Sequence, residues 1–243
     1  MVKEMIHTAK LTDKIVIAEE TMAFLFAKPE GFEFRAGQFC LLGLPDIGFR
    51  DERGLRKPLS ISSSPLDNDI MFVAKMSESA FKKTLREMPA GTAVTIDGPH
   101  GSFTLPEDTS IHIVFMAGGI AIIPFRSMVR HVAGAHTGHA ITLFYSSRTP
   151  REAAFLKELQ DIAETHRNIR LVATMTRVPE QSEAWSGLTG RINPEMIRHN
   201  CKEWRDAVYY VAGSSGMVDG IRAMLSSMDI KAERIRKEKF TGY

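Results

Sequence analysis

The sequence predicts an antiparallel β-barrel followed by a doubly wound α/β half. In the first part of the chain, short segments of mixed polar and apolar side chains are separated by turn residues, as is typical of small barrels. In the second part, continuously apolar segments alternate with stretches of helical period, as in a parallel sheet covered by helices. Pro106-Glu107-Asp108 reads as a linker between them. We therefore expect two domains, residues 1–105 and 106–243.

Six strands and one helix are expected in the first domain. The strand candidates are residues 15–19, 23–27, 38–44, 59–63, 70–75 and 93–98. The helix follows Ser79, a good N-cap, and ends at Pro89. Free N–H groups at a helix start attract phosphate, and Lys82 and Lys83 add positive charge. An ordinary capped helix with solvated lysines is an equal alternative. The expected core residues are Phe24, Phe26, Phe32, Phe34, Phe39 and Cys40.

The segment from Arg56 to Pro65 places two cations before a strand rich in hydroxyls. A strand that begins at Leu59 puts Ser60 and Ser62 on the same face. Cations beside hydroxyls suit a ligand that carries both phosphates and a polar ring. A solvated edge strand would have the same residues, so this segment decides nothing by itself.

In the second domain the strands and helices alternate. The strand candidates are residues 111–116, 140–145, 169–174, 207–211 and 234–240, and the helix candidates are 125–132, 153–165, 194–199 and 217–228. Ligands of such sheets bind beyond the carboxyl ends of the strands. Three of these ends carry suggestive residues: Gly118-Gly119, Ser146-Ser147-Arg148-Thr149, and Gly213-Ser214-Ser215-Gly216-Met217. One such turn is ordinary, but three at one edge favour a nucleotide site.

Composition excludes several classes of function. The chain has 243 residues, is 44% hydrophobic and carries a formal net charge of +2, which gives no electrostatic case for nucleic acid or an anionic membrane. Cys40 and Cys201 lie far apart, which fits a reducing cytoplasm and argues against an iron–sulfur cluster within the chain. We expect no signal peptide, no membrane span and no resident metal ion.

The order of the motifs resembles the ferredoxin–NADP(+) reductase family over nearly the whole chain. The segments that carry the resemblance are Gly37-Gln38-Phe39, Lys57-Pro58-Leu59-Ser60, the Lys-rich helix after Ser79, Gly98-Pro99-His100-Gly101-Ser102-Phe103, Gly118-Gly119 to Pro124, and Glu238-Lys239-Phe240-Thr241-Gly242-Tyr243. The family's flavin strand carries Arg-x-(Tyr/Phe)-Ser, and the matching positions here are Lys57, Leu59 and Ser60. The chain departs from the family at Leu59, which cannot stack as an aromatic ring does. It also departs at Ala121, Ile123 and Ala212, where the family has a glycine, a small or hydroxyl residue and a cysteine.

The resemblance implies a flavoprotein oxidoreductase that passes hydride from NAD(P)H to FAD and then electrons to an acceptor. The implied catalytic residues are Ser60, near the flavin N5, and Tyr243, which like Phe240 would guard the nicotinamide position. The implied flavin-binding residues are Lys57, Pro58, Leu59, Ser60, Val73, Lys75, Ser79, Ala80, Phe81 and Lys82. The implied nicotinamide-binding residues are Gly118, Gly119, Ile120, Pro124, Ser147, Arg148, Arg177, Gly213, Ser214, Met217, Phe240 and Tyr243.

Several alternatives stay open. FAD is preferred over FMN because the helix after Ser79 offers a place for a second phosphate. Ser147 and Arg148 suit a 2′-phosphate but also a free ribose diol, so both NADPH and NADH are possible, with NADPH slightly favoured. The acceptor would be a separate ferredoxin, flavodoxin or oxygenase component, or another subunit. A reductase of free flavin or small acceptors, and a flavin-binding electron-transfer subunit with weak nicotinamide activity, are the other hypotheses.

Overall fold

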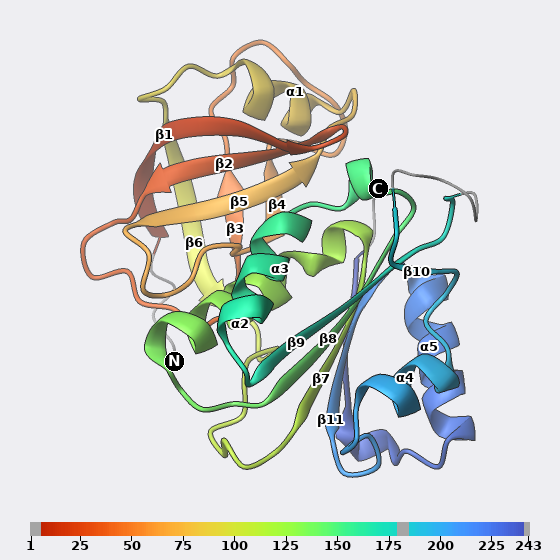
Figure 1. Cartoon of the computed structure of the whole chain (residues 1–243). Helices are drawn as coiled ribbons and strands as arrows, with labels where there is room; N and C mark the ends of the chain where they lie inside the picture. Colours follow the sequence, from red (N-terminus) through yellow and green to blue (C-terminus); the bar gives the residue numbers. More distant parts are fainter. Residues whose placement is uncertain (1–5, 179–184, 241–243) are drawn as a thin grey trace.

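The computed structural model describes residues 6–178 and 185–240, which form two halves, each built on a six-stranded sheet (Figure 1). The first sheet is antiparallel, with the strand order β4-β3-β6-β1-β2-β5. The second sheet is parallel, with the order β10-β9-β8-β7-β11-β12. The predicted fold class is confirmed. The domain boundary between residues 105 and 106 stays a prediction.

The first half contains six strands and one helix in the described residues. They are β1 (Ile6–Ala18), β2 (Thr21–Ala27), β3 (Phe39–Gly43), β4 (Arg56–Ser60), β5 (Asp69–Lys75), α1 (Ala80–Glu87) and β6 (Ala93–His100). The first strand is much longer than residues 15–19, because it pairs with β6 up to Lys10 and with β2 from Leu11 onward. A register shift between Leu11 and Asp13 makes this strand irregular. The alternation of side chains is therefore interrupted, and a search for a period of two does not detect the first part of the strand.

The strand that was expected to begin at Leu59 begins instead at Arg56 and ends at Ser60. Pro58 does not break it, because β4 is an edge strand and needs no donor on its open side. Ser62 therefore lies beyond the strand. The expectation that Ser60 and Ser62 share one strand face is wrong.

The core of the barrel contains most of the residues that were expected there. Phe24, Phe26, Phe32 and Phe34 are buried. Phe39 is only half-buried, and its ring lies 5.6 Å from that of His100, so its assignment to the core is wrong. Cys40 is fully buried, and burial raises the pKa of its thiol to about 12. It is a core residue, as expected.

The second half alternates strands and helices as predicted. Its elements are β7 (Ile113–Gly118), α2 (Ile123–Ala135), β8 (Ile141–Ser147), α3 (Leu156–Thr165), β9 (Ile169–Met175), β10 (Leu188–Thr189), α4 (Pro194–Asn200), β11 (Val208–Gly213), α5 (Ser215–Ser227) and β12 (Ile235–Lys239), with 3-10 turns at Gly119–Ile122, Pro150–Glu152 and Ala232–Arg234. The two-residue strand β10 was not predicted, because so short a segment carries no period.

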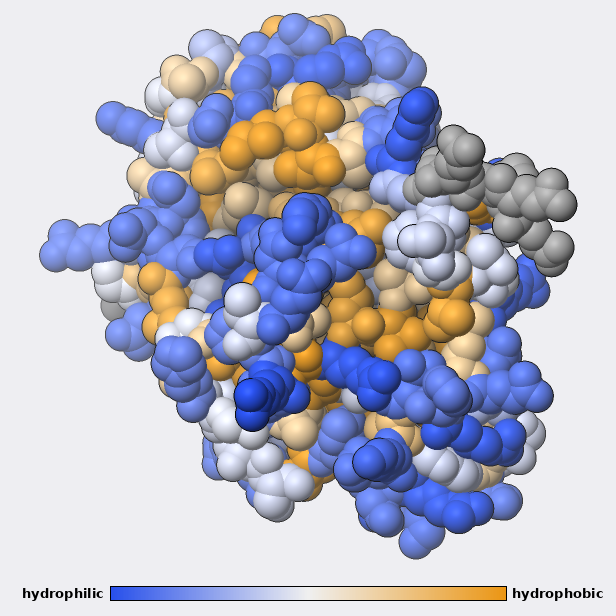
Figure 2. All heavy atoms as spheres, in the orientation of Figure 1, coloured by the Kyte–Doolittle hydropathy of each residue, from blue (hydrophilic) through white to orange (hydrophobic). Residues whose placement is uncertain are grey.

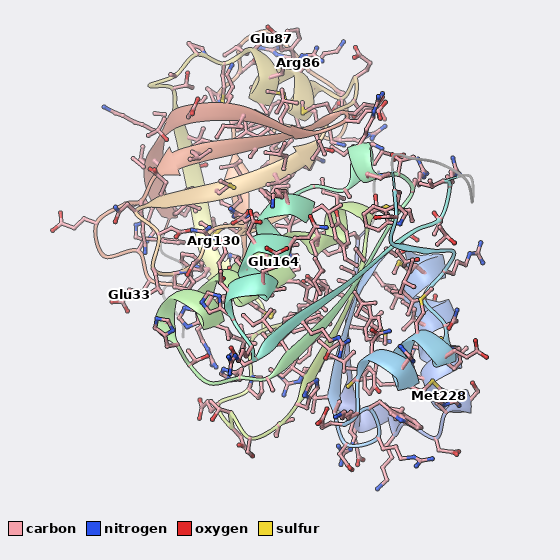
Figure 3. All side chains as sticks on the ribbon, viewed as in Figure 1. Glu33, Arg86, Glu87, Arg130, Glu164 and Met228 are labelled. Carbon is pink, nitrogen blue, oxygen red and sulfur yellow. The ribbon has the colours of Figure 1, made fainter. Side chains whose placement is uncertain are left out.

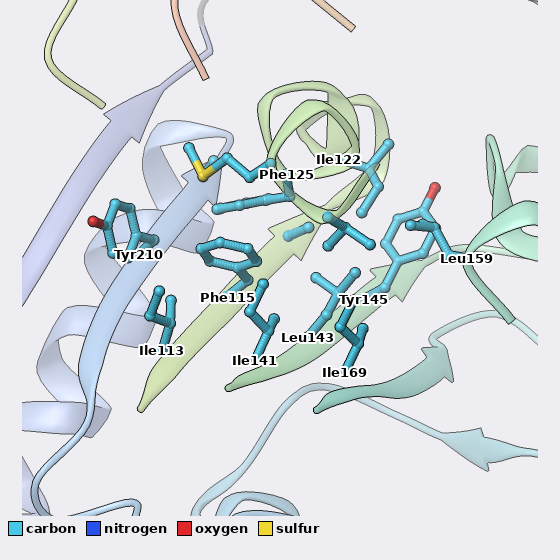
Figure 4. Packing of buried hydrophobic residues seen from close by; sticks show 14 of the residues in the cluster. Ile113, Phe115, Ile122, Phe125, Ile141, Leu143, Tyr145, Leu159, Ile169 and Tyr210 are labelled. Atoms are coloured by element: carbon cyan, nitrogen blue, oxygen red, sulfur yellow. The ribbon is translucent and has the colours of Figure 1, made fainter. Parts of the chain in front are cut away.

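Two helices cover each face of the parallel sheet (Figure 1). Helices α2 and α3 pack on the face next to the barrel, where the ring of Phe115 lies 4.7 Å from Phe125 and 5.4 Å from Tyr210 (Figure 4). Helices α4 and α5 pack on the opposite face. The cluster under α2 also includes Phe103 and Leu105, so the chain that leaves the barrel is buried against the second half.

The surface in Figure 2 is mixed, with hydrophobic side chains gathered over part of the barrel. Val16 is 73% exposed and Ile15 is 41% exposed. Among the described residues, no helix combines the length and the apolar character needed to cross a bilayer.

Candidate functional site

The parallel sheet reverses its strand order at β7. The chain runs from β7 to β8 and β9 on one side, and returns to place β11 on the other side of β7. Ligands of open α/β sheets bind in the crevice at such a switch point, outside the carboxyl ends of the strands. Here β7 ends at Gly118 and β11 ends at Gly213, so these two glycines mark the crevice.

A cavity of about 830 Å³ lies at this crevice, and residues of both halves line it. The barrel contributes Glu19, Thr21 and Lys75. The other lining residues are Gly118, Gly119, Ile120, Ser146, Ser147, Arg148, Glu152, Ala154, Thr176, Arg191, Ile192, Ser214, Gly216, Met217, Gly220, Ile221 and Met224. Seven of the predicted nicotinamide residues thus meet in one cavity: Gly118, Gly119, Ile120, Ser147, Arg148, Ser214 and Met217.

The two glycines at the end of β7 and in the turn after it differ in what surrounds them. A Cβ at Gly118 would lie 2.0 Å from Sδ of Met217, so the Met217 side chain fills the space next to this residue. Gly119 has a φ of +55°, and a Cβ built there would meet nothing within 4 Å. The left-handed backbone and the open space at Gly119 allow a ligand to approach the turn closely.

Helix α5 begins in the same cavity. Ser214 is its N-cap, and its hydroxyl accepts a hydrogen bond from the backbone N–H of Met217 at 3.4 Å. The first turn, at Ser215 and Gly216, is exposed. Free N–H groups and the helix dipole favour an anion at this position.

Charged side chains of both signs face the cavity. Arg148 pairs with Glu152 at 3.7 Å, and Glu152 also pairs with Lys75 of the barrel at 3.7 Å. Sequence reasoning missed Glu152, and it marked Thr176 and Arg191 only as parts of family-like segments without assigning them to the site. The signal for Glu152 was local, because Thr149 caps the short turn after β8 and accepts a hydrogen bond from the N–H of Glu152 at 3.3 Å.

The start of α1 differs from the prediction. Ser79 has the backbone of an N-cap, but its side chain makes no capping hydrogen bond. The carboxylate of Asp51 accepts the N–H of Ala80 at 2.8 Å instead, and this bond lowers the pKa of Asp51. The helix start therefore does bind an anion, and that anion is a side chain of the protein itself. Ser79 is thus the N-cap residue, as expected, but Asp51 supplies the capping hydrogen bond in place of its side chain.

Cations surround this carboxylate. Arg53 and Lys57 both interact electrostatically with Asp51, and the Lys57 ammonium donates to the carbonyl oxygen of Arg53. Lys82 is half-buried, and its burial, with repulsion from Arg53 and Lys75, lowers its pKa. Predicted residues from β4, β5 and α1 thus lie in one electropositive region.

Ser60 and Leu59 lie at the end of β4, next to this region in the sequence. The Ser60 side chain is buried at the strand end, whereas Leu59 is half-buried and packs on the barrel core.

The remaining predicted residues lie elsewhere. Val73 packs with Ala23 and Ile123, and Phe81 belongs to the barrel core. Pro124 is buried at the start of α2. Arg177 is exposed, and its N–H donates to the carbonyl oxygen of Arg148. None of these four lines the cavity. Of the predicted C-terminal residues, Phe240 is half-buried against the cluster under α2, while Tyr243 lies outside the described residues.

A buried carboxyl group lies near this C-terminal segment. Glu238 in β12 pairs in register with Ala212, and desolvation by burial raises the pKa of its carboxyl to about 7. Its Oε2 atom is buried without a hydrogen-bond partner. The sequence marked Glu238 only as part of a family-like segment, because burial of a charged residue leaves no local pattern.

Comparison with known proteins fits this geometry. Residues 115–223 match the family model of the oxidoreductase NAD-binding domain. The chain is 24% identical over 223 residues to the glycine betaine monooxygenase reductase subunit of Chromohalobacter salexigens, covering 90% of the chain and 60% of that protein. It is 26% identical over 234 residues to an NAD(P)H-flavin reductase of Aliivibrio fischeri, covering 93% of the chain and 92% of that protein.

A solved structure agrees over almost the full length. The chain superposes on a ferredoxin NADP+ reductase from Neisseria gonorrhoeae with a TM-score of 0.76 and 21% identity, covering 96% of this chain and 98% of that one. The resemblance to the ferredoxin–NADP(+) reductase family is therefore confirmed. The chain spans about 60% of the length of the oxygenase-reductase relatives that it matches.

Proposed function

We propose that the chain is an FAD-dependent NAD(P)H oxidoreductase that passes electrons to a separate acceptor. The observation that carries this proposal is the cavity at the switch point, which is walled by the parallel sheet and by Thr21 and Lys75 of the barrel. A nicotinamide bound at the sheet edge would thus lie against the half that carries the predicted flavin residues. The reductase subunit and the NAD(P)H-flavin reductase named above support the proposal.

The residues around the start of α1 fit the pyrophosphate of FAD. Lys82 is crowded by Arg53 and Lys75, so an anion placed among them would relieve their repulsion. Lys57 adds a fourth cation nearby, and Asp51 interacts with both Arg53 and Lys57. Bound FAD would supply the chemistry of accepting a hydride and releasing the two electrons singly.

The residues of the cavity fit a nicotinamide dinucleotide. The turn at Gly119 and the start of α5 at Ser214 would bind its pyrophosphate, and Arg148 would contact a ribose or a 2′-phosphate. Hydride transfer needs alignment rather than a strong acid or base, so the chain's contribution is to orient the partners and exclude water. Ser60 near the flavin ring and Tyr243 at the nicotinamide position stay predictions.

The acceptor lies outside this chain in our proposal. An iron–sulfur cluster normally takes four ligands, mostly cysteine thiolates, and the chain has two cysteines, both free and buried. A ferredoxin, a flavodoxin or an oxygenase component would take the electrons. The unpaired thiols fit a reducing compartment, and we propose the cytoplasm.

The test is an absorption spectrum followed by an anaerobic titration. Purified protein, reconstituted with FAD, should show flavin absorption that NADH or NADPH bleaches. A preparation that takes up neither FAD nor FMN would contradict the proposal. Rates with NADH and with NADPH then assign the donor.

A reductase of free flavin is the second candidate. It is favoured by the match to the NAD(P)H-flavin reductase, which the chain covers over 92% of its length. Fast turnover with added riboflavin or FMN, without turnover with ferredoxin-type proteins, would support it. Flavin that binds but is not bleached by either nicotinamide would instead support an electron-transfer subunit.

A further inference from the structure

Three side chains with metal-binding atoms converge at the end of the parallel sheet that lies away from the cavity. His112 directly precedes β7, Cys201 ends α4, and Glu203 lies in the turn between α4 and β11. One ligand atom from each lies within 4.8 Å of the others. The cavity lies at the carboxyl ends of the strands, whereas this group lies at their amino ends, so it has no part in the nucleotide site (Figure 1).

The backbone holds the three residues in place. The N–H of Val208 donates to the carbonyl oxygen of His112 at 3.0 Å, which fixes the turn before β11 beside the start of β7. The N–H of Cys201 donates to the carbonyl oxygen of Ile197 at 2.9 Å, which closes α4. The N–H of Ala207 donates to the carbonyl oxygen of Glu203 at 3.0 Å. The group is therefore anchored by a helix end, a strand start and a closed turn.

The orientation of the His112 ring suits a ligand. Its Nε2 lies 3.0 Å from the hydroxyl of Thr142, and its Nδ1 lies 3.7 Å from Oε2 of Glu203. In histidines that bind a metal ion, the second ring nitrogen is commonly held by a hydrogen bond to another residue. Thr142 makes this hydrogen bond to Nε2 of His112. This leaves Nδ1 on the side of Glu203.

The distance between His112 and Glu203 is close to that expected for two ligands of a tetrahedral ion. Zinc–nitrogen and zinc–oxygen bonds of about 2.0–2.1 Å at a tetrahedral angle place the two ligand atoms about 3.3–3.4 Å apart. The observed 3.7 Å between Nδ1 and Oε2 exceeds this by a few tenths of an ångström. The Glu203 side chain is 56% exposed, so it can move by that amount, and solvent can reach the site.

We propose that His112, Cys201 and Glu203 bind a divalent transition metal of the zinc class, with water as the fourth ligand. Thiolate, imidazole and carboxylate together select a borderline ion such as Zn²⁺ over Mg²⁺ or Ca²⁺, which prefer oxygen alone. The ion would tie the turn between α4 and β11 to the start of β7, far from the redox site. The proposal does not depend on the flavin function.

Cobalt(II) is the probe, because a thiolate ligand gives it a near-ultraviolet charge-transfer band. Difference spectra of the purified protein with and without Co²⁺ should show this band at one equivalent, and Zn²⁺ should abolish it. Cys201→Ser should remove the band. Cys40→Ser is the matched control, since Cys40 is the other buried free thiol and lies in the barrel core.

Glu203→Gln tests the site without touching a buried residue. Its Co²⁺ affinity should fall at least tenfold, while its thermal unfolding without metal stays as in the wild type. No band in the wild type, the same band in Cys201→Ser, or unchanged affinity in Glu203→Gln would each overturn the three-ligand site. If Cys201→Ser does not fold, the Glu203→Gln result decides.

Discussion

Arg126 of α2 donates a hydrogen bond from Nη1 to the backbone carbonyl oxygen of Ser62, at 2.8 Å, across the junction between the two halves. The same guanidinium makes two bonds to Glu158 of α3, at 2.8 and 2.9 Å, and lies over the ring of Phe155. Ser62 follows β4, which carries several of the predicted flavin residues, and α2 follows the glycine turn of the cavity. Arg126 thus connects the two proposed cofactor sites.

Two neighbouring contacts strengthen this junction. The hydroxyl of Ser127 donates to the carbonyl oxygen of Ser63 at 2.6 Å. Arg130, labelled in Figure 3, donates to Asp67 at 2.9 Å and to Glu158 at 2.7 Å. One face of α2 therefore binds the segment after β4 at several points.

We expect Arg126→Met to destabilise the protein by about 3 kcal/mol, because it leaves the buried carbonyl of Ser62 and one side of Glu158 without a partner. This loss lies at the low end of the range for breaking a buried ion pair, because Arg130 still pairs with Glu158 in the variant. Urea unfolding measures it. Lys157→Met, which removes an exposed ion pair with Asp161, is the control and should change nothing measurable. Equal effects of the two variants would contradict the role of Arg126.

Much of this architecture was predictable from the sequence, because it depends on local period and turn chemistry. The apolar strand before Gly118, the Ser214 cap of α5 and the Pro194 start of α4 are all local signals. The Asp51–Ala80 bond joins residues 29 positions apart, and the Arg126–Ser62 bond joins residues 64 apart. Such contacts follow from the packed fold, so no local pattern predicts them.

Glu238→Gln should stabilise the protein much more at pH 8 than at pH 5. The carboxyl has a folded-state pKa of about 7, above the ordinary 4.5. Both folded and unfolded states bind the proton below the ordinary pKa, so Glu238 carries no ionisation penalty there. As the pH rises through the folded pKa, its ionisation favours the unfolded state by up to about 3 kcal/mol. Urea unfolding of both proteins at the two pH values measures the difference, and a gain that is the same at pH 5 and pH 8 would argue against this cause.

Glu152→Gln should shift nicotinamide preference toward NADPH. Glu152 pairs with Arg148 at 3.7 Å, so its negative charge lowers the attraction of that guanidinium for a 2′-phosphate. Removing the charge should raise the ratio of kcat/KM for NADPH over NADH by roughly two- to fivefold, as expected for a partly exposed charge pair. Arg148→Gln should change the ratio in the opposite direction. An unchanged ratio in both variants would place the 2′ position of the ribose elsewhere.

Gly118→Ala should act through Met217. The added Cβ would lie 2.0 Å from the Met217 sulfur, so this side chain must move out of its place beside the turn. We expect a loss of about 1 kcal/mol in unfolding free energy and a higher KM for the nicotinamide. Gly118→Ala combined with Met217→Ala should lose less than the sum of the two single variants. Strict additivity would show that the glycine is needed for another reason.

Gly119→Ala is the contrasting variant, because no atom lies within 4 Å of its added Cβ. We expect Gly119→Ala to lower the free energy of unfolding by about 1 kcal/mol, because alanine disfavours the left-handed backbone at this position. This loss should not depend on Met217. Urea unfolding of Gly119→Ala with and without Met217→Ala separates the two mechanisms.

Asp51→Asn should strengthen FAD binding. The Asp51 carboxylate accepts the first N–H of α1 and stands among the cations that we assign to the FAD pyrophosphate. The FAD phosphate must either replace the Asp51 carboxylate at the helix start or bind beside it. In both cases the negative charge of Asp51 opposes the binding of FAD. We expect the Kd for FAD, measured by fluorescence quenching of added FAD, to fall roughly two- to fivefold at low salt and less at high salt. Glu52→Gln, which removes the adjacent exposed charge, is the matched control. Weaker FAD binding by Asp51→Asn would mean that the carboxylate positions the helix start for the flavin rather than competing with it.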